Sequence, residues 1–167
     1  MSDSAQSDGQ GRGYLIDDPR YYKATVEDSL TRIPHSAVLG LEIVSIERDV
    51  AILRLPYSDR LIGNPVSRTV HGGAVLSLVD SASGKAVFCA VPAPETIATL
   101  DLRIDYLKPP QPEQDLFCRA ECYKLTRSVA FVRAEVYHQP GDPIAHSVST
   151  FMRSSSSIAN STMEPSR

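Results

Sequence analysis

A histidine and two glycines lead directly into an apolar segment that carries a single carboxylate. His71, Gly72 and Gly73 precede residues 74–90, and Asp80 stands inside that segment. An unpaired buried carboxylate costs several kcal/mol in effective terms. Because a carboxylate can act as a base or as a nucleophile, Asp80 is either exposed to solvent or used by a site.

The two glycines suit the start of a helix that receives a carbonyl group. The N–H groups in the first turn of a helix have no intrahelical partner and carry partial positive charge. Gly72 and Gly73 have no Cβ, so another group can approach these donors closely. A plain glycine-rich turn explains the same residues, and the local pattern leaves both interpretations open.

Asp80 and His71 also allow two interpretations each. On a helix, Asp80 has Leu76 and Val87 as apolar neighbours and Ser77 beside it, a setting that would make it a stronger base. The alternative is a solvent-facing polar edge. His71 could be a base, a ligand or a group that only orients the turn.

Other chemistries have no pattern in this sequence. His35, His138 and His146 are scattered, with no second histidine at the spacing of metal ligands. There is no G-x-S-x-G nucleophile turn, Walker loop or Rossmann glycine pattern. We therefore expect no metal site and no bound cofactor.

Length and composition predict one soluble domain. The chain has 167 residues, of which 42% are hydrophobic, enough for one core. Its net charge of −3 gives no basic face, so we expect no nucleic-acid partner. No window approaches 18 continuous apolar residues, and the N-terminus has no apolar core stretch, so we expect no membrane span and no secretory signal.

Cys89, Cys118 and Cys122 are an odd set in apolar runs, which predicts buried thiols in a cytoplasmic protein.

The chain divides into a folded domain and two polar tails. Residues 1–13 and 154–167 are expected to be disordered, and residues 14–153 form the domain. Asp18 and Pro19 predict the start of an amphipathic helix over residues 18–32. The predicted elements that follow are a hairpin over residues 41–57, a buried helix from Ala74 to about Ala90, and strands over 97–108, 116–125, 128–138 and 143–153.

Alternation assigns the two faces of these strands. In residues 97–108 it places Ala98, Leu100 and Leu102 on the apolar face and Thr99 on the polar one. The predicted inner residues of the next two strands are Leu116, Cys118, Ala120, Cys122, Ala130, Val132, Ala134 and Val136. Short turns make these strands antiparallel, and the one long helix must cover the sheet, which gives an α+β fold.

Three strings in this order resemble one known family. "LIGNPVSRTVHGGAVLSLVD", "TLDLRIDYLKPP" and "KLTRSVAF" are similar to the hot-dog-fold acyl-CoA thioesterases of the phenylacetate-pathway (PaaI-like) type. The resemblance runs from about Ser36 to Arg153. It implies a long antiparallel sheet around one central helix, homodimers that pair again as tetramers, and active sites at the dimer interface with both chains contributing.

The resemblance also assigns roles to residues. Asp80 matches the helix carboxylate that acts as base or nucleophile on the thioester. Gly72 matches the N–H donor to the thioester carbonyl, and His71 the residue that orients the loop. Asn64 matches an asparagine that positions water or substrate, and Thr99 a residue that helps to hold the water. Because alternation puts Thr99 on the polar face, we expect it to reach Asp80 across the subunit interface.

The remaining assignments concern substrate and coenzyme A. Gly73, Ser77, Arg127 and Ser128 are the expected contacts, with Arg127 near the nucleotide end, although an ordinary turn arginine explains it equally well. The resemblance implies hydrolysis of an acyl- or aryl-CoA thioester, in which coenzyme A enters only as part of the substrate. The alternatives are a non-enzymatic acyl-CoA sensor and a hot-dog hydratase or dehydratase.

Overall fold

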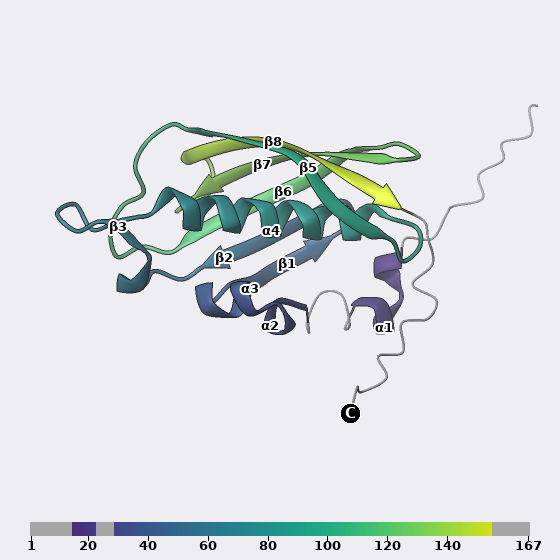
Figure 1. Ribbon diagram of the computed structural model, residues 1–167, viewed down its shortest axis with the longest axis horizontal. Coiled ribbons are helices and arrows are strands. Elements are labelled where there is room, and N and C mark those ends of the chain that lie inside the picture. Colours follow the sequence, from purple (N-terminus) through teal and green to yellow (C-terminus); the bar gives the residue numbers. More distant parts are fainter. Residues whose placement is uncertain (1–14, 23–28, 155–167) are drawn as a thin grey trace, which may run out of the picture.

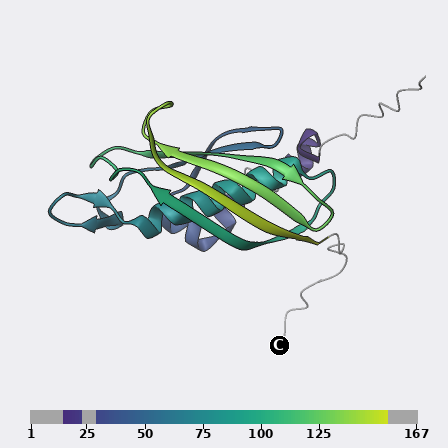
Figure 2. The same cartoon turned by 90° about the horizontal axis from the view of Figure 1, so that it is seen from above.

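A six-stranded antiparallel sheet wraps around one long helix, α4 (Gly72–Ala90), in the computed structural model, which describes residues 15–22 and 29–154 (Figure 1). The strands in the order β1-β2-β6-β7-β8-β5 are β1 (Glu42–Glu47), β2 (Val50–Leu55), β6 (Leu116–Leu125), β7 (Val129–Tyr137), β8 (Pro143–Ser154) and β5 (Thr96–Tyr106). Figure 2 shows the long strands crossing over α4. The predicted α+β architecture is confirmed, and β1 and β5 form the two edges of the sheet.

α4 is the centre of the core. Its His71 N-cap is extended, and its helical path ends at Ala90, just before Pro92, as predicted. Val75, Leu78 and Val79 have no exposed surface. By length and composition α4 could cross a membrane, but most of it is buried inside the fold, as expected for a core helix.

The inner faces of β6 and β7 agree with the predicted alternation. All eight predicted residues are buried and pack against α4 as part of one apolar cluster. The three cysteines are free and buried. Burial raises the pKa of the Cys89 thiol to about 12 and that of Cys122 to about 11, so these thiols are unreactive at neutral pH.

A β-bulge in β5 overturns the predicted alternation up to Leu100, whereas Leu102 packs against the core as predicted. Thr99 pairs with Phe151 and Asp101 with Thr150, so Leu100 is an extra residue in the ladder. The extra residue shifts the phase of the strand. Thr99 therefore faces α4 instead of the outer side, and Leu100 is 58% exposed.

The N-terminal elements differ in part from the single predicted helix. The described pieces are η1 (Leu15–Asp17), α1 (Pro19–Tyr22), α2 (Ser29–Arg32) and α3 (Pro34–Leu39). Residues 23–28 of the predicted helix lie outside the described residues, as do the predicted tails except Ser154, which ends β8. Pro34 does not only end a helix but begins α3, at the N1 position that proline favours, and Gly40 ends it with a φ of 68°.

A small hairpin that the sequence did not predict precedes α4. It consists of β3 (Ile62–Asn64) and β4 (Thr69–Val70) and follows the short η3 (Asp59–Leu61). The backbone N–H of His71 donates to Leu61 O at 2.7 Å, which ties the hairpin to the start of α4.

Candidate active site

The start of α4 leaves one backbone donor unpaired. His71 Nδ1 accepts the Gly73 N–H at 2.9 Å, and His71 O accepts the Ala74 N–H at 2.9 Å. Among the described residues, the Gly72 N–H meets no acceptor. Because the Nδ1 lone pair is used by Gly73, the neutral His71 ring carries its proton on Nε2. The Gly72 N–H is thus left without a partner among the described residues and could donate to a carbonyl oxygen.

Tyr106 holds the same turn from β5. Its hydroxyl donates to Gly72 O at 2.8 Å. A Cβ added at Gly72 would lie 3.2 Å from this hydroxyl oxygen, and one at Gly73 would lie 2.9 Å from His71 Nδ1. Glycine at these two positions therefore leaves room for Tyr106 and His71, two neighbours that the sequence pattern could not identify. Gly72 and Tyr106 line a hollow of about 490 Å³ at this end of α4.

Asp80 lies two turns further along α4 and is held from β5. Thr99 Oγ1 donates to Asp80 Oδ1 at 2.8 Å within the same chain. The expectation that Thr99 reaches Asp80 only across a subunit interface is wrong, because the bulge at Leu100 turns Thr99 toward α4. The hydrogen bond leaves Oδ2 of the half-buried Asp80 for another group.

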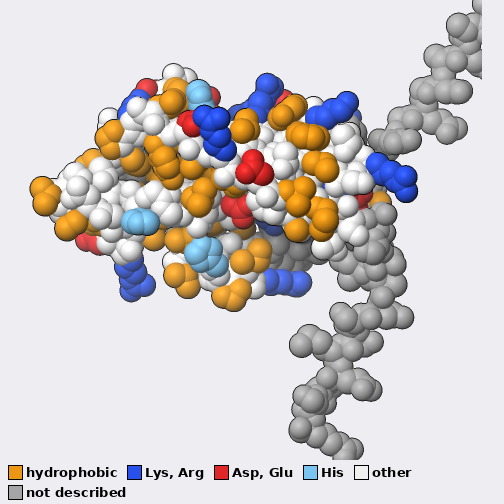
Figure 3. All heavy atoms as spheres, turned by 45° about the horizontal axis from the view of Figure 1, so that its top comes forward, with side chains coloured by type: hydrophobic (Ala, Val, Ile, Leu, Met, Phe, Trp, Pro, Cys, Tyr) orange, Lys and Arg blue, Asp and Glu red, His pale blue; other side chains and the backbone are white. Residues whose placement is uncertain are grey.

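Two adjoining hollows meet at Asp80. One of about 320 Å³ lies toward Ser77 and Leu102, and the other, of about 300 Å³, lies toward Phe88. Both are lined by His35, Asp80 and Ser81. Figure 3 shows this face, on which hydrophobic, histidine and acidic side chains surround a recess. Asp80 is therefore neither a buried carboxylate without a partner nor a fully exposed one. It is half-buried and faces a cleft.

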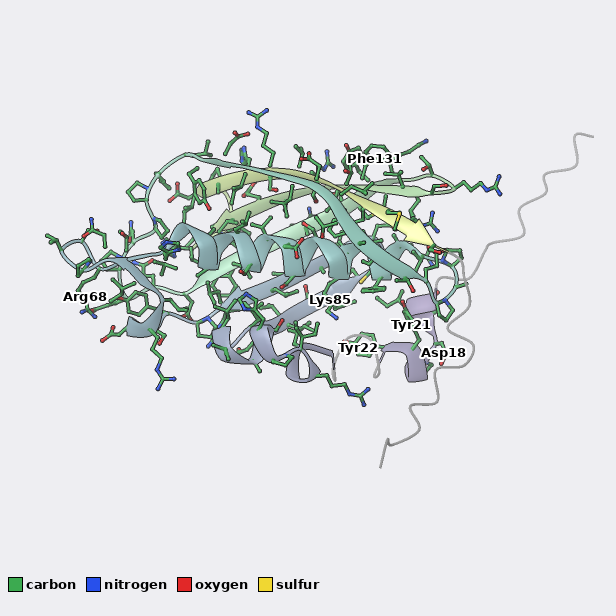
Figure 4. All side chains as sticks on the ribbon, in the orientation of Figure 1. Asp18, Tyr21, Tyr22, Arg68, Lys85 and Phe131 are labelled. Carbon is green, nitrogen blue, oxygen red and sulfur yellow. The ribbon has the colours of Figure 1, made fainter. Side chains whose placement is uncertain are left out.

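The part of this cleft toward Phe88 is lined largely by apolar side chains, and one lysine lies among them. The lining residues Leu30, Ile33, Phe88, Ile97 and Phe151 come from α2 to β8. Lys85 is only 5% exposed, and its ammonium lies 5.7 Å from the centre of the Phe88 ring. In Figure 4 it lies on the side of α4 that faces the N-terminal helices. Burial lowers the pKa of Lys85 to about 8.

Ser77 and His35 extend the network away from Asp80. Ser77 Oγ donates to Gly73 O at 3.0 Å, and His35 Nε2 lies 3.0 Å from the same Oγ. Ser77 therefore lines the cleft, and its hydroxyl is engaged within the chain. The sequence pattern leaves His35 as one of several scattered histidines. Its only signal was its place one residue after Pro34, which begins α3.

Three predicted residues lie away from Asp80 in the single chain. Asn64 Oδ1 accepts the N–H groups of Val66 and Ser67, so its carbonyl shapes the β3–β4 turn. Arg127 and Ser128 form the β6–β7 turn, and Ser128 O accepts the N–H of Arg153. Since β8 runs from the Gly72 end of the sheet to this turn, Arg127 and Gly72 lie at opposite ends of the molecule.

A carbonyl bound to the Gly72 N–H lies beyond the direct reach of Asp80 of the same chain. Eight residues separate Gly72 and Asp80, and a rise of about 1.5 Å per residue puts them about 12 Å apart along the helix axis. A reacting carbon must lie within about 3–3.5 Å of its nucleophile.

Within residues 15–22 and 29–154, no cluster of three or more His, Cys, Asp or Glu is arranged to hold a metal ion.

Comparisons with known proteins point to one superfamily. The model of the thioesterase superfamily matches residues 68–145, which run from the turn before α4 into β8. The medium/long-chain acyl-CoA thioesterase YigI of Escherichia coli K12 is 28% identical over 133 residues, covering 72% of this chain and 85% of YigI.

Two solved structures share the fold. A protein from Pseudomonas aeruginosa is 46% identical with a TM-score of 0.68, covering 75% of this chain and 93% of its own. A mutant of the phenylacetic acid degradation protein PaaI from Thermus thermophilus is 26% identical with a TM-score of 0.64, covering 72% of this chain and 99% of its own. The chain therefore belongs to the thioesterase superfamily, and its sheet wrapped around α4 is the hot-dog fold of that superfamily.

Proposed function

We propose that this protein is an acyl-CoA thioesterase that hydrolyses the thioester to a free acid and coenzyme A. Membership of the superfamily and the similarity to YigI support this activity. The observation that carries the proposal is the pair of features on α4. At the start of α4, the Gly72 N–H has no partner among the described residues. Two turns later, Asp80 accepts a hydrogen bond from Thr99 and faces a cleft.

The chemistry follows from these two groups. The thioester oxygen accepts the Gly72 N–H, which stabilises the negative charge that develops when the carbonyl carbon is attacked. Asp80 takes a proton from water as the water oxygen bonds to that carbon, or its own Oδ2 attacks first and water then opens the mixed anhydride. In either case the C–S bond breaks with its electron pair on sulfur, and the thiolate takes up the proton.

We propose that two copies of the chain complete each site. If two α4 helices lie antiparallel about Leu76, Gly72 of one copy stands beside Asp80 of the other. The edge strand β5 borders both groups, since Thr99 donates to Asp80 and Tyr106 donates to Gly72 O. Leu76 is 40% exposed at the proposed axis, which fits an apolar contact between copies. A further pairing of such dimers remains part of the proposal.

The same arrangement gives the predicted coenzyme A contacts a place. Arg127 and Ser128 lie at the far end of the sheet from Gly72 of their own chain. An antiparallel second copy carries its own β6–β7 turn toward the Gly72 end. We propose that Arg127 of that copy meets the phosphates of coenzyme A, a pairing that guanidinium geometry favours.

The experiment is a thiol-release assay on straight-chain acyl-CoAs and phenylacetyl-CoA, comparing the wild type with Asp80→Asn. The amide keeps the shape and can still accept from Thr99, but it cannot take up a proton. We expect kcat to fall by about two orders of magnitude or more. The melting temperature should stay within about 3 °C of the wild type, because Asp80 is only half-buried.

Asp101→Asn is the matched control, since this carboxylate is exposed on the other side of β5. It should leave kcat unchanged. Binding of acyl-CoA without thiol release by the wild type would refute hydrolysis and favour the sensor. Full activity of Asp80→Asn would refute the assigned role of the carboxylate.

A further inference from the structure

His35 reaches the candidate site from α3, outside the strings that carry the family resemblance. Its Nε2 lies 3.0 Å from Ser77 Oγ, and its ring lines both hollows at Asp80. The side chain therefore touches the first part of α4 and the cleft at once. Proline at the first position of α3 and the left-handed Gly40 at its end fix this short helix.

The hydrogen bonds of Ser77 determine which nitrogen of His35 carries the proton. A hydroxyl has one hydrogen, and Ser77 donates it to Gly73 O at 3.0 Å. Ser77 Oγ must then accept from His35, so the neutral ring carries its hydrogen on Nε2. The lone pair of Nδ1 remains, and no described residue donates to it. His35 thus brings one fixed acceptor to the cleft.

Asp80 brings the other acceptor. Its Oδ1 is occupied by the Thr99 hydroxyl, which leaves Oδ2 for a water molecule. A water that donates to one acceptor can still rotate about that bond. A second acceptor removes this freedom and directs the oxygen lone pair away from both, toward an electrophile.

We propose that His35 is a further catalytic residue, whose Nδ1 accepts the second hydrogen of the water that Asp80 activates. The inference rests on the proposed thioesterase activity and adds a group to the same site. The water oxygen bonds to the thioester carbon, and its first proton passes to Asp80 Oδ2. The C–S bond breaks with its pair on sulfur, and Asp80 returns the proton to the thiolate. His35 keeps its own proton and gains none.

The test compares His35→Phe with His35→Gln. Phenylalanine keeps the ring shape but has neither donor nor acceptor. Glutamine carries an N–H that can donate to Ser77 and an oxygen that can accept from water. We expect kcat to fall about tenfold or more in His35→Phe, with KM within about twofold, and to recover to within about threefold of the wild type in His35→Gln.

His146→Phe is the matched control, because His146 is exposed on the outer face of β8, away from α4. Affinity for a non-hydrolysable thioether analogue, measured by calorimetry, should be equal in all four proteins. Wild-type kcat in His35→Phe would overturn the inference, and so would equal losses in the two His35 variants or a loss of analogue binding. Thiol release by the wild type separates this failure from failure of the proposed function. If the proposed function is wrong, the wild type releases no thiol at all.

Discussion

The turn before α4 holds its free donor in place by bonds to neighbouring groups. His71 Nδ1 takes the Gly73 N–H, Tyr106 donates to Gly72 O, and Ser77 donates to Gly73 O. His71 O accepts from the helix, which polarises the peptide that carries the Gly72 N–H. A donor fixed before the substrate arrives needs no reorganisation when charge develops.

Gly72→Pro tests this donor, and Gly72→Ala, which adds the same Cβ beside Tyr106 but keeps the N–H, is its control. Proline has no N–H but is favoured at the first position of a helix, and His71 already has the extended conformation that a following proline requires. We expect kcat to fall about 10²- to 10³-fold in the thiol-release assay. Circular dichroism should show an intact fold. Unchanged turnover would mean that the N–H does not bind the developing oxyanion.

The sequence allows prediction of the residues that bear the chemistry better than of those that orient them. Asp80 and Gly72 stand out because a carboxylate or a double glycine is costly in an apolar helix. The orientation of Thr99 could not be predicted, because a single bulge residue reverses every side chain beyond it. His35 and Tyr106 act through contacts over long sequence separations, which no local pattern contains.

At the scale of elements, α4 serves both as core and as catalytic support. One side packs on β2, β6 and β7, and the other carries Ser77, Asp80 and Ser81 toward the cleft. Its long apolar run made it predictable over almost its full length. The hairpin β3–β4 and the helix α3 were not predicted, because both are short and are held by turns and caps rather than by periodic burial.

Val79→Ala tests how much of the stability the buried side of α4 supplies. Val79 has no exposed surface, so losing two methyl groups should lower the free energy of unfolding by about 2 kcal/mol. Val66→Ala makes the same chemical change at a side chain that is 93% exposed and should have an effect within about 0.5 kcal/mol. Urea denaturation followed by circular dichroism measures both. Equal losses would contradict the assigned burial.

At the scale of the whole molecule, the proposed site exists only between copies. The two active groups lie about 12 Å apart along one helix, so one chain offers half of each of two sites. The sequence suggested this arrangement only through family resemblance. The geometry of a single chain now supplies a physical reason for it, because Gly72 and Asp80 lie at equal distances on either side of Leu76 in α4.

Complementation of inactive variants tests shared sites. Asp80→Asn and Gly72→Pro should each be nearly inactive alone. If they are co-expressed with different tags, random pairing makes about half of the dimers mixed, and each mixed dimer has one intact site of two, so about a quarter of the wild-type rate is expected. Sites contained within one chain would instead give only the sum of the two residual rates.

The extra residue Leu100 lets the two parts of β5 contact different sites on α4. Which side chains face α4 therefore depends on the number of residues in the strand rather than on their types. Before Leu100 the strand carries Thr99, which donates to Asp80. After Leu100 it carries Tyr106, which donates to Gly72 O at the start of α4. Conservative replacements here would leave the geometry untouched, whereas losing one residue would turn Thr99 outward and Ala98 inward. Evolution within this scaffold is therefore freer to vary the chemistry of this strand than its length.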